Sequence, residues 1–208
     1  MKKILINYNF TPDKEWIGDD YIIYDRSDSK DYLKDFDQSK IMYQENMGQV
    51  DYPKLNYLVD NYDNLPEAFL WGKTNLFKYI TREEYNLVKD NKIFTPLLTK
   101  GHKTYSDRLG VVNYYSEGIY WERNDVAQAA MNQFSSKYFE TFRDFAHEFA
   151  LPNLPYIPFF PGGNCLLTKE RVHRYGVDFY KKLASILPYA REPREAQMAE
   201  RAYYLMWR

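Results

Sequence analysis

The sequence has little cysteine and histidine, which limits the metal and redox chemistry that it can support. Its 208 residues include one cysteine, Cys165, and three widely spaced histidines, His102, His147 and His173. A single cysteine excludes an intramolecular disulfide and a cysteine zinc site. The spacing of the histidines matches no metal-ligand pattern either. We therefore expect a reduced, cytoplasmic setting.

The chain also lacks a charge imbalance and long apolar runs. It carries 28 basic and 29 acidic residues, for a net charge of -1, so no overall field attracts nucleic acid or an anionic membrane. No apolar run approaches the roughly 18 residues that a membrane span needs. The opening segment starts with basic residues, but its apolar stretch is too short for a signal peptide. Residues 3–10 instead predict a buried core strand.

Aromatic residues are abundant. They make up 18% of the chain, with 21 tyrosines, whereas the hydrophobic fraction of 45% and the charged fraction of 27% are ordinary for a globular protein. Tyrosine and tryptophan combine a flat apolar face with a polar group, which suits binding to sugar rings and bases. The same residues also serve to cover half-buried surface.

Predicted strands and helices alternate along the chain. Apolar runs predict strands at residues 3–10, 21–24, 67–71 and 165–167. Helices are predicted after a cap at Asp51 and from the capping box at Thr81 to Val88. One long helix is predicted from Asn124 through a Tyr138–Phe149 stripe, another from a cap at Thr168 through a Val172–Ile186 stripe, and a final helix at 193–207. We expect an α/β fold in which helices flank a mostly parallel sheet with residues 3–10 near its centre, all within a single domain of residues 1–208.

Three segments give no such pattern. Residues 28–44 are polar and predict irregular structure with one helical turn. Residues 90–120 are rich in glycine and predict loops with an edge hairpin. Residues 152–161 carry four prolines and predict a rigid connector.

A glycine turn precedes the second helix. In Asn46-Met47-Gly48 the glycine allows the backbone to approach a ligand, and the helix N-terminus that follows favours a phosphate. An ordinary turn is the alternative. The helix then stops at Asn64-Leu65-Pro66, before a strand that ends on Trp71-Gly72-Lys73.

The order of these features resembles the donor side of nucleotide-sugar enzymes with the glycosyltransferase-A fold. The run from Val59 to Pro66, with Phe69, Leu70 and Gly72 after it, is similar to an uncharacterised family placed among those folds. The resemblance implies a glycosyltransferase-A-like domain that binds a nucleotide-diphosphate sugar on residues 1–90 and a saccharide or glycan acceptor on residues 91–208. Its nucleotide side would include Tyr8, Asp25, Asn46, Gly48 and Lys73.

The chain departs from that family pattern at the metal motif. Where Asp-x-Asp is expected, it has Trp71-Gly72-Lys73. A divalent ion that bridges a diphosphate needs a protein carboxylate, whereas a lysine can neutralise phosphate directly. Transfer is then metal-independent, or the carboxylate comes from elsewhere, or the domain is not catalytic. Asp35-Phe36-Asp37 is the alternative motif. We predict no metal ligands at the expected place.

Two further segments resemble parts of such transferases. Gly162, Gly163 and Asn164 resemble an acceptor-side glycine segment, although they would also serve to turn a corner. Glu117 and Trp121, with Glu122, form a carboxylate-aromatic cluster that would shape an acceptor pocket or simply pack a loop.

The closing helix resembles one found at the end of several polysaccharide transferase families. The resemblance implies that Glu195 or Glu200 deprotonates the acceptor and that Arg201 stabilises the leaving diphosphate. Local ion pairs on a solvated helix face are the alternative. A non-catalytic carbohydrate- or nucleotide-binding module on the same fold is the alternative function.

Overall fold

The computed structural model describes residues 1–98, 105–108, 110–116 and 119–208. Its main sheet has six strands in the order β3-β2-β1-β4-β10-β5. They are β1 (Lys2–Asn7), β2 (Tyr21–Asp25), β3 (Ile41–Tyr43), β4 (Ala68–Lys73), β5 (Thr95–Pro96) and β10 (Cys165–Thr168). β1 to β4 are parallel, and β10 runs antiparallel to both β4 and β5. The predicted α/β fold and the central place of the first strand are confirmed.

A second, smaller sheet is antiparallel, with strand order β6-β7-β8-β9. It consists of β6 (Tyr105–Asp107), β7 (Gly110–Ser116), β8 (Ile119–Arg123) and β9 (Tyr156–Phe159). β9 arises from the proline-rich segment that we expected to be a rigid connector. It lies at the edge of the sheet, where Pro158 can pair opposite Trp121 without having to donate on both sides.

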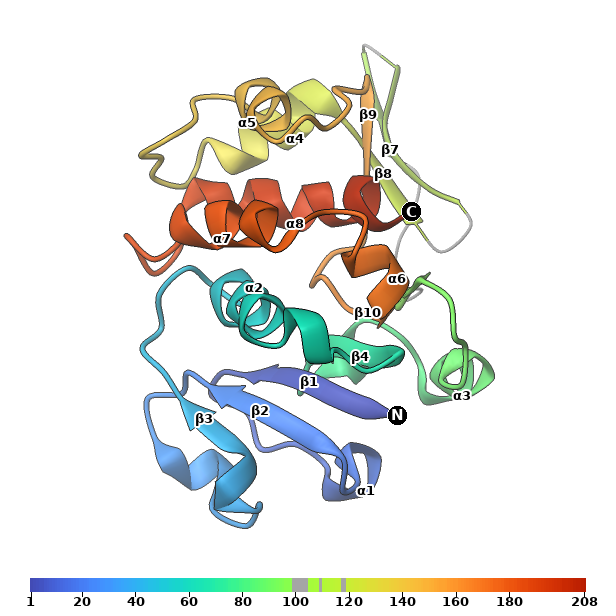
Figure 1. Cartoon of the computed structure of the whole chain (residues 1–208). Helices are drawn as coiled ribbons and strands as arrows, with labels where there is room; N and C mark the ends of the chain where they lie inside the picture. The colour runs from blue at the N-terminus through green and yellow to red at the C-terminus, as the bar shows by residue number, and fades with distance from the viewer. Residues whose placement is uncertain (99–104, 109, 117–118) are drawn as a thin grey trace.

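Helices cover both faces of the main sheet (Figure 1). The helices of the described residues are α1 (Lys14–Ile17), α2 (Asp51–Asp60), α3 (Arg82–Val88), α4 (Asn124–Met131), α5 (Phe142–Glu148), α6 (Lys169–Val172), α7 (Val177–Ser185) and α8 (Arg194–Trp207). Of these, α4 and α5 lie away from the main sheet, against α8 (Figure 1). One core packs α2, α7 and α8 on the sheet and continues to α4 and α5, through residues such as Leu58, Leu183 and Met206. A smaller core, around Trp16 and Leu33, fills the other face.

Two predicted long helices are each divided in two. α4 ends at Met131, and a new helix, α5, begins only after Thr141, whose side chain accepts a hydrogen bond from the Asp144 backbone N–H. Tyr138 therefore lies outside any helix and is exposed. The helix after Thr168 likewise ends at Val172, and α7 begins after Gly176. At Thr141 a capping box starts the new helix, whereas at Gly176 no side-chain cap is present and the glycine itself marks the break.

Smaller differences occur near the first helices. The polar segment 28–44 contains β3, a short edge strand that its polarity concealed. Asp51 is the first residue of α2 and not its cap, because Val50 takes the cap position without a side-chain hydrogen bond. The predicted capping box of Thr81 with Glu84 and the cap at Thr168 are confirmed.

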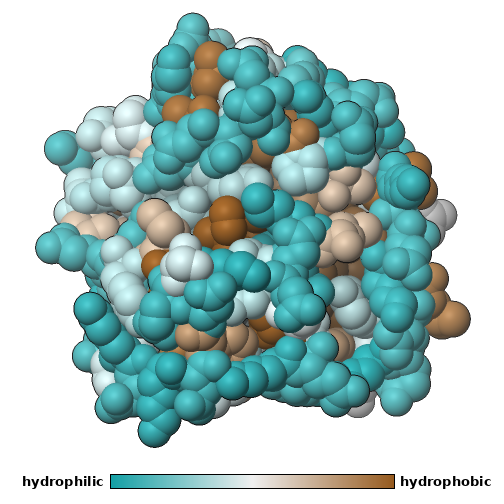
Figure 2. Space-filling view, turned by 60° about the horizontal axis from the view of Figure 1, so that its bottom comes forward, coloured by the Kyte–Doolittle hydropathy of each residue, from teal (hydrophilic) through white to brown (hydrophobic). Residues whose placement is uncertain are grey.

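Polar side chains dominate the face seen in Figure 2, where apolar atoms form small, separate patches. Such patches are common on globular proteins and need no partner. Within the described residues, no helix is both long enough and apolar enough to cross a membrane.

Candidate nucleotide pocket and buried ionic cluster

A network of hydrogen-bonded polar side chains lies at the carboxyl ends of β1, β2 and β4. The Asn7 side-chain amide donates to Asp25 Oδ1 at 3.1 Å, and the Thr74 hydroxyl donates to Asn7 Oδ1 at 2.5 Å. All three residues are buried. β2 and β4 lie on opposite sides of β1, so the strand order reverses here. Open α/β sheets bind ligands outside the strand ends at such a reversal.

A pocket of about 230 Å³ lies beside this network. It is lined by Tyr8, Arg26, Asn46, Gln49, Val50, Arg191 and Glu192. Arg26 directly follows β2 and donates from Nη2 to Asn46 Oδ1 at 2.5 Å and to the Met47 carbonyl at 2.9 Å. The Arg191 guanidinium lies 5.1 Å from the centre of the Tyr8 ring and also donates to its hydroxyl. The fold thus brings Tyr8 and Asn46 of the predicted nucleotide side together.

The pocket is suited to an anion. Arg26 is only 3% exposed, and its Nε has no hydrogen-bond partner in the described part of the chain. Burial lowers the pKa of Arg26 to about 10, with Asp51 acting in the opposite direction, so the guanidinium stays charged at neutral pH. α2 starts at the edge of the pocket, next to Val50. A helix N-terminus and two guanidinium groups attract phosphate, whereas Glu192 opposes it.

Asp25, unlike the residues of the pocket, makes its hydrogen bonds within the network at the strand ends. Its Oδ1 accepts hydrogen bonds from the Asn7 amide and, at 2.6 Å, from the Ser27 hydroxyl. Its other carboxylate oxygen is buried without a partner among the described residues. The side chain is 2% exposed and is not among those that line the pocket.

Gly48 has a packing role that we did not predict. Its φ is +66°, and a Cβ would lie 2.6 Å from Tyr52 Cβ and 3.1 Å from Leu187 Cβ. Its backbone N–H donates to the Ala190 carbonyl at 2.8 Å. The glycine therefore allows its loop to pack against the segment that carries Arg191, and this close contact accounts for it without a ligand.

A second group of charged residues, which does not line the pocket, is what we call the ionic cluster: Asp51, Lys54, Lys73 and Glu200. They come from α2, β4 and α8 and meet at the loop of residues 162–164. Lys54 Nζ donates to the Gly163 carbonyl at 2.7 Å, and the Gly162 N–H donates to Glu200 Oε1 at 2.5 Å. The Tyr203 hydroxyl donates to Asp51 Oδ1 at 2.7 Å. Asp51 joins the two sites, because it also interacts electrostatically with Arg26.

Burial and mutual charge set the protonation of the cluster. Burial raises the pKa of Asp51, and the neighbouring Glu200 carboxylate adds to the effect. Burial lowers the pKa of Lys54, partly offset by Asp51. For Lys73 burial acts to lower the pKa, but Glu200 and Tyr79 outweigh it and the net pKa is raised. Lys73 is therefore the firmly cationic member of the cluster.

The glycine loop holds Lys73 in place. Asn164 Oδ1 accepts a hydrogen bond from the Lys73 backbone N–H at 2.8 Å, and Lys73 Nζ donates to the Tyr79 hydroxyl at 3.2 Å. Gly162 has a φ of +89°, and a Cβ there would lie 2.7 Å from the Tyr79 ring. Asn164 Nδ2 is buried and has no partner within the described ranges. The predicted acceptor segment is thus brought against the predicted phosphate-binding lysine.

Glu195 is not placed to act as a base. It is fully buried, and its Oε1 accepts hydrogen bonds from the Ser136 hydroxyl at 2.9 Å and from the Tyr138 N–H at 2.8 Å. Tyr189 donates to its other oxygen. Burial acts to raise the pKa of Glu195, but the hydrogen bonds from Tyr189 and Tyr138 outweigh it and lower the pKa. Its acceptor sites are filled by Tyr189 and by the segment that precedes α5.

Arg201 is also engaged in the fold. Its Nη2 lies 3.0 Å from Glu122 Oε2, and its guanidinium lies 4.7 Å from the centre of the Phe159 ring. Both partners belong to the second sheet, and Arg201 is 5% exposed. The pair anchors α8 to β8 and leaves no free guanidinium for a leaving group.

The predicted carboxylate-aromatic cluster is only partly described. Trp121 stacks on Tyr114 with ring centres 5.8 Å apart in the second sheet, and Glu117 lies outside the described residues.

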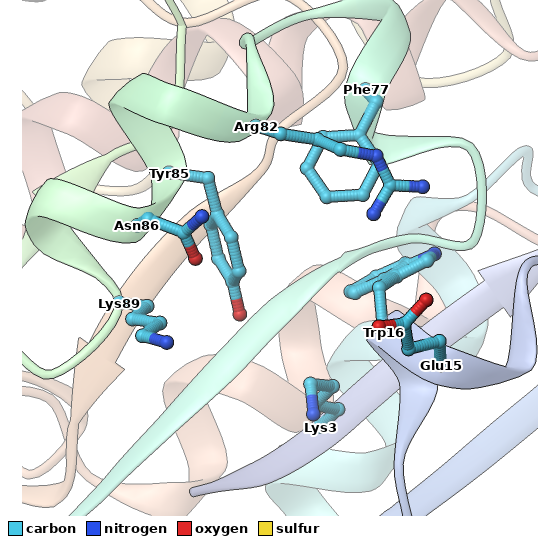
Figure 3. Close-up of a pocket in the computed structure, with 8 residues that line it drawn as sticks. All are labelled: Lys3, Glu15, Trp16, Phe77, Arg82, Tyr85, Asn86 and Lys89. Atoms are coloured by element: carbon cyan, nitrogen blue, oxygen red, sulfur yellow. The ribbon is translucent and has the colours of Figure 1, made fainter.

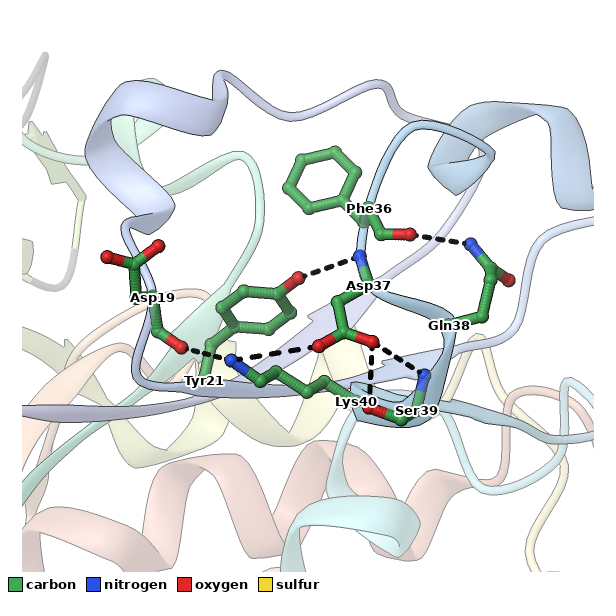
Figure 4. Close-up of polar contacts among 7 residues, drawn as sticks. All are labelled: Asp19, Tyr21, Phe36, Asp37, Gln38, Ser39 and Lys40. Atoms are coloured by element: carbon green, nitrogen blue, oxygen red, sulfur yellow. Dashed lines mark hydrogen bonds and ion pairs between the residues drawn. The ribbon is translucent and has the colours of Figure 1, made fainter.

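Within the described residues, the carboxylates do not gather into a metal site. Across the described ranges, no group of three or more His, Cys, Asp or Glu side chains is arranged to hold a metal ion. Of the alternative motif, Asp37 accepts from the Ser39 N–H at 3.0 Å and lies 3.9 Å from Lys40 Nζ (Figure 4). It caps a short turn of helix, so the donor set does not fit a metal bound to a diphosphate.

Sequence reasoning missed several residues of the site. Arg26 had a signal, because it lies two residues after the predicted strand at 21–24. Arg191 lies just before the predicted closing helix, but nothing in the sequence marked it. Asp51 and Lys54 had no signal, since only the fold shows that both are buried.

Comparison of the chain with protein-family models, curated proteins and solved structures gives no match.

Proposed function

We propose that this chain is a glycosyltransferase-A-like enzyme that moves a sugar from a nucleotide-diphosphate donor to a saccharide acceptor. The observation that carries the proposal is the pocket at the strand reversal, where Arg26 and Arg191 flank the start of α2. Two guanidinium groups match the charge and the bidentate geometry of a diphosphate. Tyr8, under Arg191, offers a ring for the base or ribose.

The ionic cluster would supply the chemistry of transfer. In the reaction, an acceptor hydroxyl oxygen bonds to the anomeric carbon, the bond from that carbon to the diphosphate oxygen breaks, and the hydroxyl proton goes to a base. Glu200 is the carboxylate best placed for the base, because Gly162 orients its Oε1 and the carboxylate is not fully buried. Lys73 would hold the charge of the departing diphosphate.

A non-catalytic nucleotide- or carbohydrate-binding module remains the second candidate. The observation that favours it is the engagement of Glu195 and Arg201 in structural contacts, which leaves fewer groups for catalysis. Such a module would bind through the same arginine pocket. Binding and turnover therefore have to be measured separately.

Calorimetric titration with UDP, GDP and ADP tests the pocket. We expect one of these nucleotides to bind, and Arg191→Ala to weaken its binding about tenfold or more, because a charge-assisted contact is lost. Arg143→Ala, which removes an exposed arginine on α5, is the matched control. If no nucleoside diphosphate binds, the transferase and a nucleotide-binding module are both wrong.

Turnover then separates the two candidates. Release of nucleoside diphosphate from nucleotide sugars is measured for the wild type and for Glu200→Gln, with saccharide acceptors added. Release that the substitution abolishes, with nucleotide affinity retained, supports the transferase. Nucleotide binding without release by the wild type supports the binding module.

A further inference from the structure

A second pocket, of about 340 Å³, lies near the opposite ends of the strands. Its lining residues are Lys3, Glu15, Trp16, Phe77, Arg82, Tyr85, Asn86 and Lys89. Lys3 is near the start of β1, whereas Tyr8 directly follows its end, so the two pockets are separated by about 16 Å along the strand. The pocket near Lys3 is independent of the proposed nucleotide site.

Aromatic rings form the base of this pocket. Trp16 and Phe77 meet edge to face with centres 5.4 Å apart, and Phe77 and Tyr85 do the same at 5.8 Å. The Arg82 guanidinium lies 4.3 Å from the centre of the Phe77 ring and is held there by Asp13, 2.5 Å away. These contacts arrange the aromatic base of the pocket before any ligand binds.

Polar donors converge on the hollow from the other side. Figure 3 shows Tyr85, Asn86 and Lys89 around one side and Lys3 below. Lys3 Nζ donates to the Ile17 carbonyl at 2.9 Å, which leaves two of its three donors. The side chains of Asn86 and Lys89 make no hydrogen bond or ion pair in the part of the chain that the structure describes. Donors that are positioned but unused are what an anion needs.

The charges of the residues that line the pocket also favour an anion. Three basic side chains line the pocket against one carboxylate, that of Glu15, and Asp13 offsets part of the charge of Arg82. The pKa of Lys3 is lowered, first by burial and further by Lys89, although Asp20 and Asp19 act to raise it. An anion between Lys3 and Lys89 would relieve the repulsion between these two ammonium groups.

We infer that this second pocket binds a sugar-sized organic anion, in which a compact ring carries a phosphate or carboxylate group. The anionic group would lie between Lys3, Lys89 and the Tyr85 hydroxyl, and the ring would lie against Tyr85 and the guanidinium of Arg82. The volume is at the lower end of the range for small-molecule sites, of roughly 300–1,000 Å³, and suits a single ring.

The test is calorimetric titration of the full chain with glucose 6-phosphate, glucuronate, inorganic phosphate and glucose. We expect glucose 6-phosphate or glucuronate to bind more tightly than phosphate or glucose alone, and whichever of the two binds identifies the anionic group. Lys89→Glu should weaken this binding about tenfold or more by reversing a charge. Lys92→Glu makes the same change at an exposed lysine that does not line the pocket and should leave the affinity unchanged.

Tyr85→Phe keeps the ring and removes only the hydroxyl, so it should also weaken binding severalfold. The inference is overturned if neither ring-bearing anion binds at millimolar concentration, or if phosphate alone binds as tightly as they do. An equal loss in Lys89→Glu and Lys92→Glu would show a general charge effect and would overturn it as well.

Discussion

At the scale of single residues, Lys73 is the cation of the ionic cluster that the proposal assigns to the departing diphosphate. Lys73→Ala should weaken binding of a nucleoside diphosphate by about 1.5–3 kcal/mol, the contribution of a charge-assisted hydrogen bond. Calorimetry measures the change, with Lys78→Ala as the control because Lys78 is exposed nearby. Unchanged affinity in a folded Lys73→Ala variant would remove the lysine from the site.

A second prediction at the scale of residues concerns the contribution of Gly48 to the stability of the fold. Gly48→Val should lower the free energy of unfolding by about 2 kcal/mol or more, because the new Cβ meets Tyr52 and the backbone φ is positive. Denaturant unfolding measures it. Gly176→Ala is the control, since a Cβ there meets nothing within 4 Å among the described residues and φ is -65°. Equal stabilities of the two variants would contradict the packing role.

At the scale of elements, Glu195 ties the start of α8 to the segment before α5. Glu195→Gln should lower the free energy of unfolding by about 1–3 kcal/mol, because an amide cannot accept all the hydrogen bonds that the carboxylate receives. Denaturant unfolding at pH 7 measures the loss. Glu192→Gln, at an exposed glutamate, should leave the stability unchanged.

The same carboxylate makes a pH-dependent contribution. The pKa of Glu195 is lower in the folded chain than in the unfolded one, because its hydrogen bonds outweigh burial. Its stabilising contribution is therefore complete above the ordinary glutamate pKa of about 4.3 and is lost as the pH falls through the folded pKa. Unfolding curves between pH 7 and pH 3 should converge for the wild type and Glu195→Gln. A constant difference at all pH values would show that the charge of Glu195 does not matter.

At the scale of the whole molecule, the distribution of charge bears on the need for metal. We expect any transfer activity to need little added divalent metal, because Lys73 stands where metal carboxylates are expected and would repel a divalent cation. Turnover is measured with a chelator and then with magnesium or manganese restored. Loss of activity on chelation, with rescue by metal, would show that a carboxylate elsewhere in the fold takes the role.

The sequence by itself determined the elements that depend on local pattern. Alternating apolar runs and caps such as Thr81 and Thr168 specified most of the strands of the main sheet and several helix starts. Periodicity failed where a later cap, Thr141, divided an expected helix, and where β3, at 3 residues, was too short to show a pattern within a polar segment.

Only the tertiary structure decided how the candidate site is assembled. Lys73 and Asn164 are 91 positions apart and meet because β10 pairs with β4, a choice that depends on long-range contacts and not on either segment alone. The partners of Glu195 and Arg201 were set in the same way, when α8 packed against the segment before α5 and the second sheet. Residue types near each other in sequence show local structure, but the burial and pairing of a charge depend on which distant elements close over it.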